Sequence, residues 1–240
     1  MNFGEARADL VRRARQLEEL VKARLEVDVP GLVAGVRARV ETRLHLQPIP
    51  VDNDLADKPG PLKLGHVRTS AWECPEARKV VLTQVAMRPL LEGLALVIHP
   101  AANRAAPIFA CDLMALPTRI SVHADVYGDP ERTRGVFAGL GESFGRLRSQ
   151  SGPAWAQSIG SGRGLHARAS LRLVDDVFAA LTSALGVYLD VLTAAPLADP
   201  NEAADKSFFE AFHAHGPRRG PLGHVLGSAW AERYSRLIFE

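Results

Sequence analysis

The chain has 240 residues, of which 47% are hydrophobic and 23% are charged, and we predict a single folded domain over residues 1–240. The 29 Lys and Arg residues nearly balance the 27 Asp and Glu residues, which argues against nucleic-acid binding. No run of about 18 apolar residues is present, so we expect no membrane segment. The N-terminal segment is charged where a signal peptide is apolar, and we therefore expect a cytoplasmic protein.

The N-terminal part of the chain is predicted to be helical. Apolar residues recur there at helical spacing, at Leu10, Ala14, Leu17, Val21 and Leu25. We expect Pro30 to end this helix and a second helix to cover residues 31–44. A turn-rich, proline-containing connector then occupies residues 47–61.

Five short segments with the alternation of β-strands follow. They cover residues 62–72, 78–87, 94–99, 107–116 and 120–127. The links between them are too short for crossover helices, so neighbouring strands should pair antiparallel. The pattern predicts an antiparallel meander.

Helical spacing returns after Pro130. We predict a helix over residues 131–148, a loop at Gly160–Gly164, a long apolar helix from Leu171 to Pro196, and shorter helices over 207–214 and 224–238. Helices on both sides of a run of antiparallel strands predict an α+β fold in which helices cover the sheet.

Neither the glycine-rich loop nor the histidines match a known ligand motif. The loop Gly-Ser-Gly-Arg-Gly lacks the spacing of phosphate-binding loops, so a simple turn is the better interpretation. His213 and His215 are two residues apart, whereas zinc ligands on a helix are usually four apart. Cys74 and Cys111 form no Cys-x-x-Cys pair. We therefore predict no bound metal.

Asp112 is the most unusual residue of the predicted sheet. Alternation puts its side chain on one strand face with Ile108, Ala110 and Met114, and the other face is apolar as well. A carboxylate buried there is costly unless it is paired, protonated or directed at a polar ligand. Two interpretations follow: a buried salt bridge to an arginine, or a proton donor that apolar surroundings keep protonated.

Two blocks of sequence resemble the ferredoxin-dependent bilin reductases. The first contains Arg78-Lys79, Gly93-Leu94, Pro100, Ala106-Pro107-Ile108-Phe109-Ala110-Cys111-Asp112 and Ala124-Asp125. The second, similar to the closing helix of the family, is Ala229-Trp230-Ala231-Glu232-Arg233-Tyr234 followed by Leu237-Ile238-Phe239. The resemblance extends from about Leu62 to the end, and it is that of a divergent member near the phycocyanobilin:ferredoxin oxidoreductase branch.

The resemblance implies a three-layer α/β/α sandwich with a central antiparallel sheet flanked by helices. It also implies that biliverdin, an open-chain tetrapyrrole, binds between the sheet and the C-terminal helices. In this family electrons arrive singly from ferredoxin, protons come from side chains, and no metal or flavin is bound. Asp112 matches a strand aspartate that hydrogen-bonds the pyrrole nitrogens and relays protons, so the resemblance assigns it a catalytic role.

Other acid–base positions of the family are not kept. Matching through Pro100 puts Ala95 where related enzymes have a catalytic histidine, and Thr83 near their catalytic glutamate. His215 or Gly216 falls where the family has an Asn-Asp pair. Neither alanine nor threonine replaces a proton donor efficiently, which puts reduction of the A-ring vinyl group in doubt.

The sequence offers replacements for these groups. Ala95, Val97 and His99 share a strand face, so we expect His99 to point into the same pocket, about 13 Å beyond Ala95, as a further catalytic candidate. His213 and His215 belong near the expected helical roof. We count His215 among the catalytic candidates and His213 among the substrate contacts.

The remaining predicted substrate contacts follow from the chemistry of a tetrapyrrole, whose two propionates need basic partners. Lys79 and Arg168 are the candidates, and Arg168 lies close to a strand arginine that holds a propionate in the family. Arg163 is more simply a solvated surface charge. Thr83, Ala95 and Val97 complete the predicted lining of the pocket.

We predict ferredoxin-dependent reduction of biliverdin or a related linear tetrapyrrole by radical one-electron steps with side-chain proton donation. The expected partners are the tetrapyrrole and reduced ferredoxin, with no bound cofactor. An alternative is a non-catalytic bilin- or haem-binding protein of the same fold. A second alternative, a structural subunit with an empty pocket, is less consistent with the costly carboxylate of Asp112.

Overall fold

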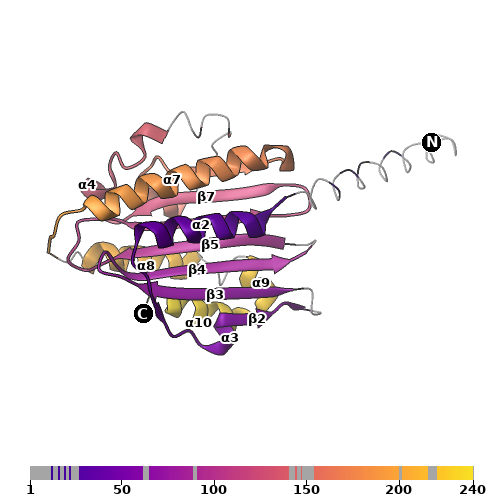
Figure 1. The fold of residues 1–240 in the computed structure, drawn as a ribbon, viewed down its shortest axis with the longest axis horizontal. Helices are drawn as coiled ribbons and strands as arrows, with labels where there is room; N and C mark the ends of the chain where they lie inside the picture. Colours follow the sequence, from indigo (N-terminus) through magenta and orange to yellow (C-terminus); the bar gives the residue numbers. More distant parts are fainter. Residues whose placement is uncertain are drawn as a thin grey trace.

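The structure is a computed structural model that describes residues 27–61, 65–88, 91–140, 154–199, 202–215 and 221–239, with the single residues Arg12, Gln16, Glu19, Lys22, Phe144 and Leu147. Its centre is one antiparallel sheet (Figure 1). The described strands are β1 (Gln47–Ile49), β2 (Asp57–Pro59), β3 (His66–Glu73), β4 (Ala77–Met87), β5 (Leu91–Pro100), β6 (Ile108–Ala115), β7 (Ile120–Tyr127) and β8 (Leu165–Ala169). Their order is β1-β3-β4-β5-β6-β7-β8, and β2 also pairs with β3.

The predicted meander is confirmed as β3 to β7. Each of these strands pairs antiparallel with the next one along the chain. Sequence alternation did not predict β1, β2 and β8, which have 3, 3 and 5 residues. Strands this short contain too few alternations to be separated from loop sequence.

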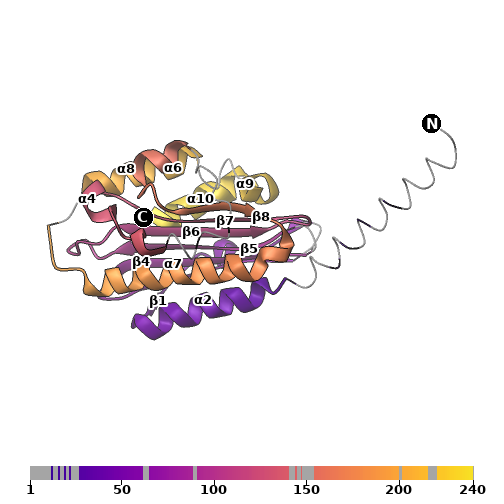
Figure 2. The same cartoon turned by 90° about the horizontal axis from the view of Figure 1, so that it is seen from above.

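Two helices cover one face of the sheet, α2 (Val29–Arg43) and α7 (Val174–Ala194), as Figure 2 shows. The predicted helix over 31–44 is thus confirmed, and it begins at Val29 with Pro30 in its first turn. The Asp28 side chain accepts a hydrogen bond from the Gly31 amide at 2.9 Å, and proline is well tolerated in a first helical turn.

Helix α7 is strongly apolar. The segment Leu171–Ala194 is the one described helix that is long and apolar enough to cross a membrane by length and composition, with a mean hydropathy of 1.7. The buried side chains of α7 recur about every four residues, at Val177, Leu181, Leu185, Leu189 and Leu192. They belong to the core on this face of the sheet, as in the central helix of a folded domain.

The opposite face is covered by a layer of shorter helices (Figure 2). They are α6 (Ala154–Ile159), α8 (Glu202–His215), α9 (Pro221–Leu226) and α10 (Ser228–Phe239), with α3 (Asn53–Ala56) at the β3 end. The indole of Trp230 donates to the Asp54 carbonyl at 3.0 Å, which ties α10 to α3. The predicted α+β fold with helices on both faces is confirmed.

The prediction of a continuous helix over 131–148 was wrong. Over the described residues 130–140 the chain forms α4 (Pro130–Thr133) and a 3₁₀ turn at Ala138–Leu140, and Gly135 between them has a φ of 83°. Of residues 141–148 only Phe144, which is helical, and Leu147 are described. A left-handed residue interrupts a helix, and glycine adopts that conformation without strain. The predicted helix from Leu10 to Leu25 lies largely outside the described residues, although Arg12, Gln16, Glu19 and Lys22 are helical.

Candidate functional site

A row of polar side chains crosses the middle of the sheet on the face beneath the C-terminal helices. Residues that pair directly across antiparallel strands point to the same face. The successive pairs place six residues in one row from β3 to β8: Thr69, Thr83, Ala95, Asp112, His123 and His166. We call these six residues the polar row.

Asp112 and His123 form the centre of the polar row. The Nδ1 atom of His123 lies 3.0 Å from Oδ1 of Asp112, and its Nε2 atom lies 2.6 Å from the hydroxyl of Tyr127. Because a carboxylate only accepts hydrogen bonds, Nδ1 of His123 carries the hydrogen of this contact. The imidazole is therefore held at both nitrogens.

The structure corrects the expected environment of Asp112. Its side chain is 40% exposed in this structure, and its partner is a histidine whose own side chain is 18% exposed. Among the described residues, Asp112 makes no salt bridge with an arginine, and its surroundings are not wholly apolar. Oδ1 of Asp112 makes the hydrogen bond with His123, and the side chain remains partly accessible on the sheet face beneath the C-terminal helices.

A second carboxylate–imidazole pair lies beside the first, towards β8. The rings of His123 and His166 are 4.5 Å apart, and Nε2 of His166 lies 3.7 Å from Oδ2 of Asp125. Asp125 is fully buried and accepts hydrogen bonds from the amide of Val126 and from Ser161. The two pairs together concentrate four titratable groups on one part of the sheet.

The glycine-rich loop serves this second pair. A Cβ atom at Gly164 would lie 2.4 Å from Cγ of Asp125, and one at Gly160 would lie 2.6 Å from its Oδ2. Only residues without a side chain let the loop approach the buried carboxylate this closely. The interpretation of the loop as a turn, rather than a nucleotide site, agrees with this packing.

Tyr234 of α10 covers the other end of the polar row. Burial raises the pKa of Tyr234 to about 12, a hydrogen bond with Thr83 opposes that rise, and the charge of Asp112 adds to it. Thr83 is fully buried and lies 3.1 Å, oxygen to oxygen, from Thr69. Tyr234 is thus a neutral phenol close to Asp112, and Thr83 lies beneath it rather than open to a ligand.

His99 lies on the predicted strand face but not in a polar pocket. It is 2% exposed, and its ring contacts the edges of Phe208 and Phe239. Burial lowers its pKa to about 3, the charges of Arg78 and Lys79 act in the same direction, and the backbone of Ile238 opposes them. Its ring nitrogens have no hydrogen-bond partner among the described residues, and the ring stays neutral at ordinary pH, so His99 is a poor proton donor.

The other predicted residues are distributed around this centre. Lys79 donates to the Leu237 carbonyl at 3.0 Å, so its ammonium group stabilises the end of α10 instead of reaching a propionate. His213 is half-buried on α8 and stacks on Phe209, away from the polar row. His215 is in the same helix, but its side chain lies outside the described part of the chain.

The positions nearest Asp112 on β5 and β8 keep their predicted placement. Ala95 pairs with Asp112 and is half-buried, and Val97, two residues on, is buried. Arg168 is exposed on the same sheet face, one pair of residues beyond His166, whereas Arg163 is exposed in the loop. Arg168 is therefore the basic residue best placed at the edge of the site.

His123, His166, Tyr127 and Tyr234 were not among the predicted site residues. His123 was recognisable in principle, because a four-residue turn between β6 and β7 sets the pairing of Asp112 with His123. The pairing becomes visible only when strand register is considered together with residue type. Among the described residues, no group of three His, Cys, Asp or Glu side chains is arranged to hold a metal ion.

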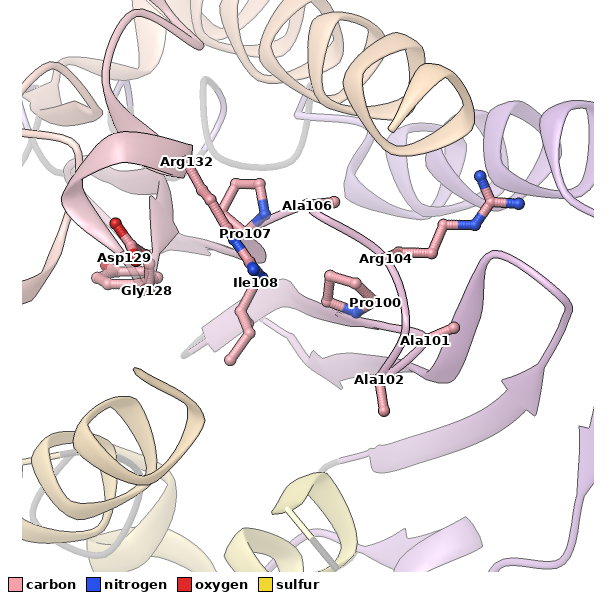
Figure 3. A pocket seen from close by; sticks show the side chains of 11 residues that line it. Pro100, Ala101, Ala102, Arg104, Ala106, Pro107, Ile108, Gly128, Asp129 and Arg132 are labelled. Carbon is pink, nitrogen blue, oxygen red and sulfur yellow. The ribbon is translucent and has the colours of Figure 1, made fainter. Parts of the chain in front are cut away.

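A separate small cavity lies where β5, β6 and β7 meet the loops (Figure 3). It has a volume of about 30 Å³ and is bordered by Pro100, Arg104, Pro107 and Arg132, among others. Arg104 donates to the Ala195 carbonyl and Arg132 to the Asp199 carbonyl. A cavity of this size holds water but not a tetrapyrrole, so it is not the pigment site.

Comparisons with known proteins agree with the resemblance of the two sequence blocks. The family model described as ferredoxin-dependent bilin reductase matches residues 33–240. The fold is similar to the crystal structure of phytochromobilin synthase from tomato in complex with biliverdin, with a TM-score of 0.74 and 14% sequence identity over 88% of this chain and 83% of that chain. No curated protein matches the sequence.

Proposed function

Because the chain belongs to the ferredoxin-dependent bilin reductase family, we propose that it reduces biliverdin or a related linear tetrapyrrole by single-electron steps. The family establishes a bilin-reducing oxidoreductase with ferredoxin as external electron donor. The choice of biliverdin, the radical course and the residues involved are our proposal. We place the pigment between the polar row and the layer formed by α8 and α10.

The observation that carries this proposal is the exposure of Asp112. On a sheet whose inward-facing residues are mostly apolar, its carboxyl group is held by His123 on one side and is open towards the helices on the other. A carboxyl group can hydrogen-bond the pyrrole nitrogens of a bilin and transfer a proton to the reduced pigment. We assign Asp112 the role of proton donor.

The reaction needs two electrons and two protons for each double bond reduced. Reduced ferredoxin supplies one electron at a time, so the pigment passes through a one-electron-reduced radical. The buried groups around Asp112 then serve to deliver protons in step with the electrons.

The propionates of the pigment need a cation at the edge of the site. Arg168 is exposed, shares the face of the polar row and lies on β8, at the rim of the sheet. A guanidinium group binds a carboxylate with two parallel hydrogen bonds. We propose that Arg168 holds one propionate, in place of Lys79, whose ammonium group is bound to α10.

The test is anaerobic incubation of the protein with biliverdin, a ferredoxin and ferredoxin reductase, followed by absorbance and chromatography of the product. We expect one-to-one binding with a shifted spectrum, and then loss of biliverdin to a reduced bilin. A bound spectrum that never changes under reduction would support the non-catalytic binding protein instead. No binding at saturating pigment would overturn both functions.

A further inference from the structure

We propose that His123 stores the second proton of the reaction and passes it to Asp112 beneath the bound pigment. This inference rests on the proposed function and goes beyond it, because it assigns the proton supply to a histidine on β7. The family resemblance places a histidine at position 95 on β5, where this chain has alanine. In this chain the histidine beside Asp112 is His123, which lies on β7, on the other side of β6 from β5.

A second proton donor is needed because the bound pigment covers Asp112, the first one. Asp112 is 40% exposed here, and a bilin lying against it closes that access to water. The carboxyl group holds one transferable proton, whereas reduction of a double bond consumes two. The second proton must come from a group already in contact with Asp112, and His123 at 3.0 Å is that group among the described residues.

The surroundings of His123 accept both of its protonation states. In the neutral ring, Nδ1–H donates to Asp112 and the hydroxyl of Tyr127 donates to Nε2. In the imidazolium, Nε2–H donates to the oxygen of the same hydroxyl, which only has to rotate its hydrogen. Burial raises the pKa of Tyr127 well above its usual value, and the charges of Asp125 and Asp112 add to that rise, so the phenol stays protonated throughout.

Charged and titratable groups face His123 from each neighbouring strand. Asp112 lies on β6, His166 on β8, and Tyr127 on β7 itself. Asp125 is paired with His166, so each of the two stacked imidazoles has its own carboxylate. This arrangement lets the ring of His123 carry a positive charge beside a second imidazole, because the carboxylate of Asp125, next to that second ring, compensates it.

The proposed steps consume two electrons from ferredoxin and two protons, one from Asp112 and one from His123. Before reduction, Asp112 is a carboxylic acid and His123 an imidazolium. The first electron from ferredoxin and the proton of Asp112 reduce the pigment to a neutral radical. His123 then reprotonates Asp112 through Nδ1, and the second electron with this proton completes the dihydro product. Asp112 ends as a carboxylate and His123 as a neutral imidazole whose remaining hydrogen is on Nε2, where the hydroxyl oxygen of Tyr127 accepts it. After the product leaves, water reprotonates both groups, which restores the hydrogen on Nδ1 of His123.

The test compares two Asp–His pairs of the same sheet. His123→Asn keeps an N–H donor near Asp112 but cannot carry a proton. The matched control is His66→Asn, because Nδ1 of His66 lies 2.8 Å from Oδ1 of Asp57 at an exposed position of β3, away from the site. Both proteins are assayed with biliverdin and reduced ferredoxin, and electron paramagnetic resonance follows the radical during a single turnover.

We expect His123→Asn to bind biliverdin normally, to form the radical, and to accumulate it while product formation falls about a hundredfold. His66→Asn should behave as the wild type. Equal product formation and no added radical in His123→Asn, with an active wild type, would overturn this inference and leave the proposed function intact. A wild type that neither binds nor reduces a bilin would instead overturn the proposed function.

A measurement on the unmodified protein covers the case in which His123→Asn does not fold. Nitrogen-15 NMR of the histidine rings in the biliverdin complex reports whether each ring is neutral or charged. We expect the His123 ring to be an imidazolium in the complex before reduction and neutral after a single turnover. A ring that remains neutral throughout would contradict the proton store.

Discussion

The two faces of the sheet are built by alternate residues of the same strands, yet their chemistry is opposite. The face beneath α2 and α7 is apolar along the central strands, at Val80, Leu82, Leu94, Leu96, Ile98, Phe109, Cys111, Leu113, Val122, Ala124 and Val126. The face beneath α8 and α10 carries Asp112, His123, Asp125 and His166. The first face holds the fold together, and the second combines packing with chemistry.

The contrast is sharpest at two consecutive residues of β6. Cys111 is buried against the long helices, and Asp112 faces the C-terminal helices with His123 beside it. The two residues are neighbours in one strand and differ in the face to which their side chains point. The side chains around each position therefore decide whether a carboxylate is tolerated there.

A carboxylate on the apolar face should be strongly destabilising. In Cys111→Asp the new charge would be surrounded by apolar side chains, and we expect a loss of about 3–5 kcal/mol in the free energy of unfolding. Urea denaturation measures it. Cys111→Val is the control and should cost less than about 1.5 kcal/mol. Equal stability of the two variants would show that water reaches the side chain at this position.

Removing the proton of Asp112 should affect turnover more than stability. Asp112→Asn keeps the size and hydrogen bonding of the side chain, and we expect turnover to fall by roughly a hundredfold or more, equivalent to about 2.7 kcal/mol of barrier. Biliverdin binding and the melting temperature should stay close to the wild type, and a radical should accumulate in electron paramagnetic resonance. Unchanged product formation would remove Asp112 from the mechanism.

Acidification should destabilise the protein through His99, which is buried among aromatic side chains. Its pKa is about 3 in the folded protein, below the value of about 6.5 in an unfolded chain, so the unfolded state binds the proton first. Stability is therefore full above pH 6.5 and is lost as the pH falls towards 3. Between pH 7 and 5 this residue should cost about 2 kcal/mol.

The matched variant for this prediction is His99→Phe, which suits the aromatic contacts with Phe208 and Phe239. Urea unfolding at pH 7 and pH 5 should show a smaller loss for the variant than for the wild type, by the same amount. Parallel losses in the two proteins would mean that His99 is protonated in the folded state.

The smallest effect is expected where neither face is involved. Gly35 is exposed on α2, and a Cβ atom there has no atom within 4 Å, so Gly35→Ala should raise the free energy of unfolding by about 0.5–1 kcal/mol. Turnover should not change. Gly164→Ala is the variant to compare with it. There the new Cβ atom would lie 2.4 Å from Cγ of Asp125, so the same substitution should be destabilising. Thermal melts of both variants decide this.

Sequence patterns predicted the five central strands because each has at least eight residues and so contains a run of apolar positions between turn residues. Asp112 could also be singled out, since a carboxylate in such a strand is costly. The pair with His123 was not predicted, because it depends on the register between β6 and β7, which the alternation within a single strand does not specify. His99 was placed on the correct face, but its enclosure by Phe208 and Phe239 depends on residues more than 100 positions later.

The hydrogen bonds that join α10 to α3 and to β4 have a consequence for the order of synthesis. The sheet is finished with β8 at Ala169, whereas the helix that Trp230 and Lys79 anchor ends 70 residues later. At about 5–20 residues per second, a ribosome needs roughly 4–14 s to make that segment. During this interval the nascent sheet shows an uncovered, partly apolar face, so we expect the emerging chain to depend on chaperone protection until α10 arrives.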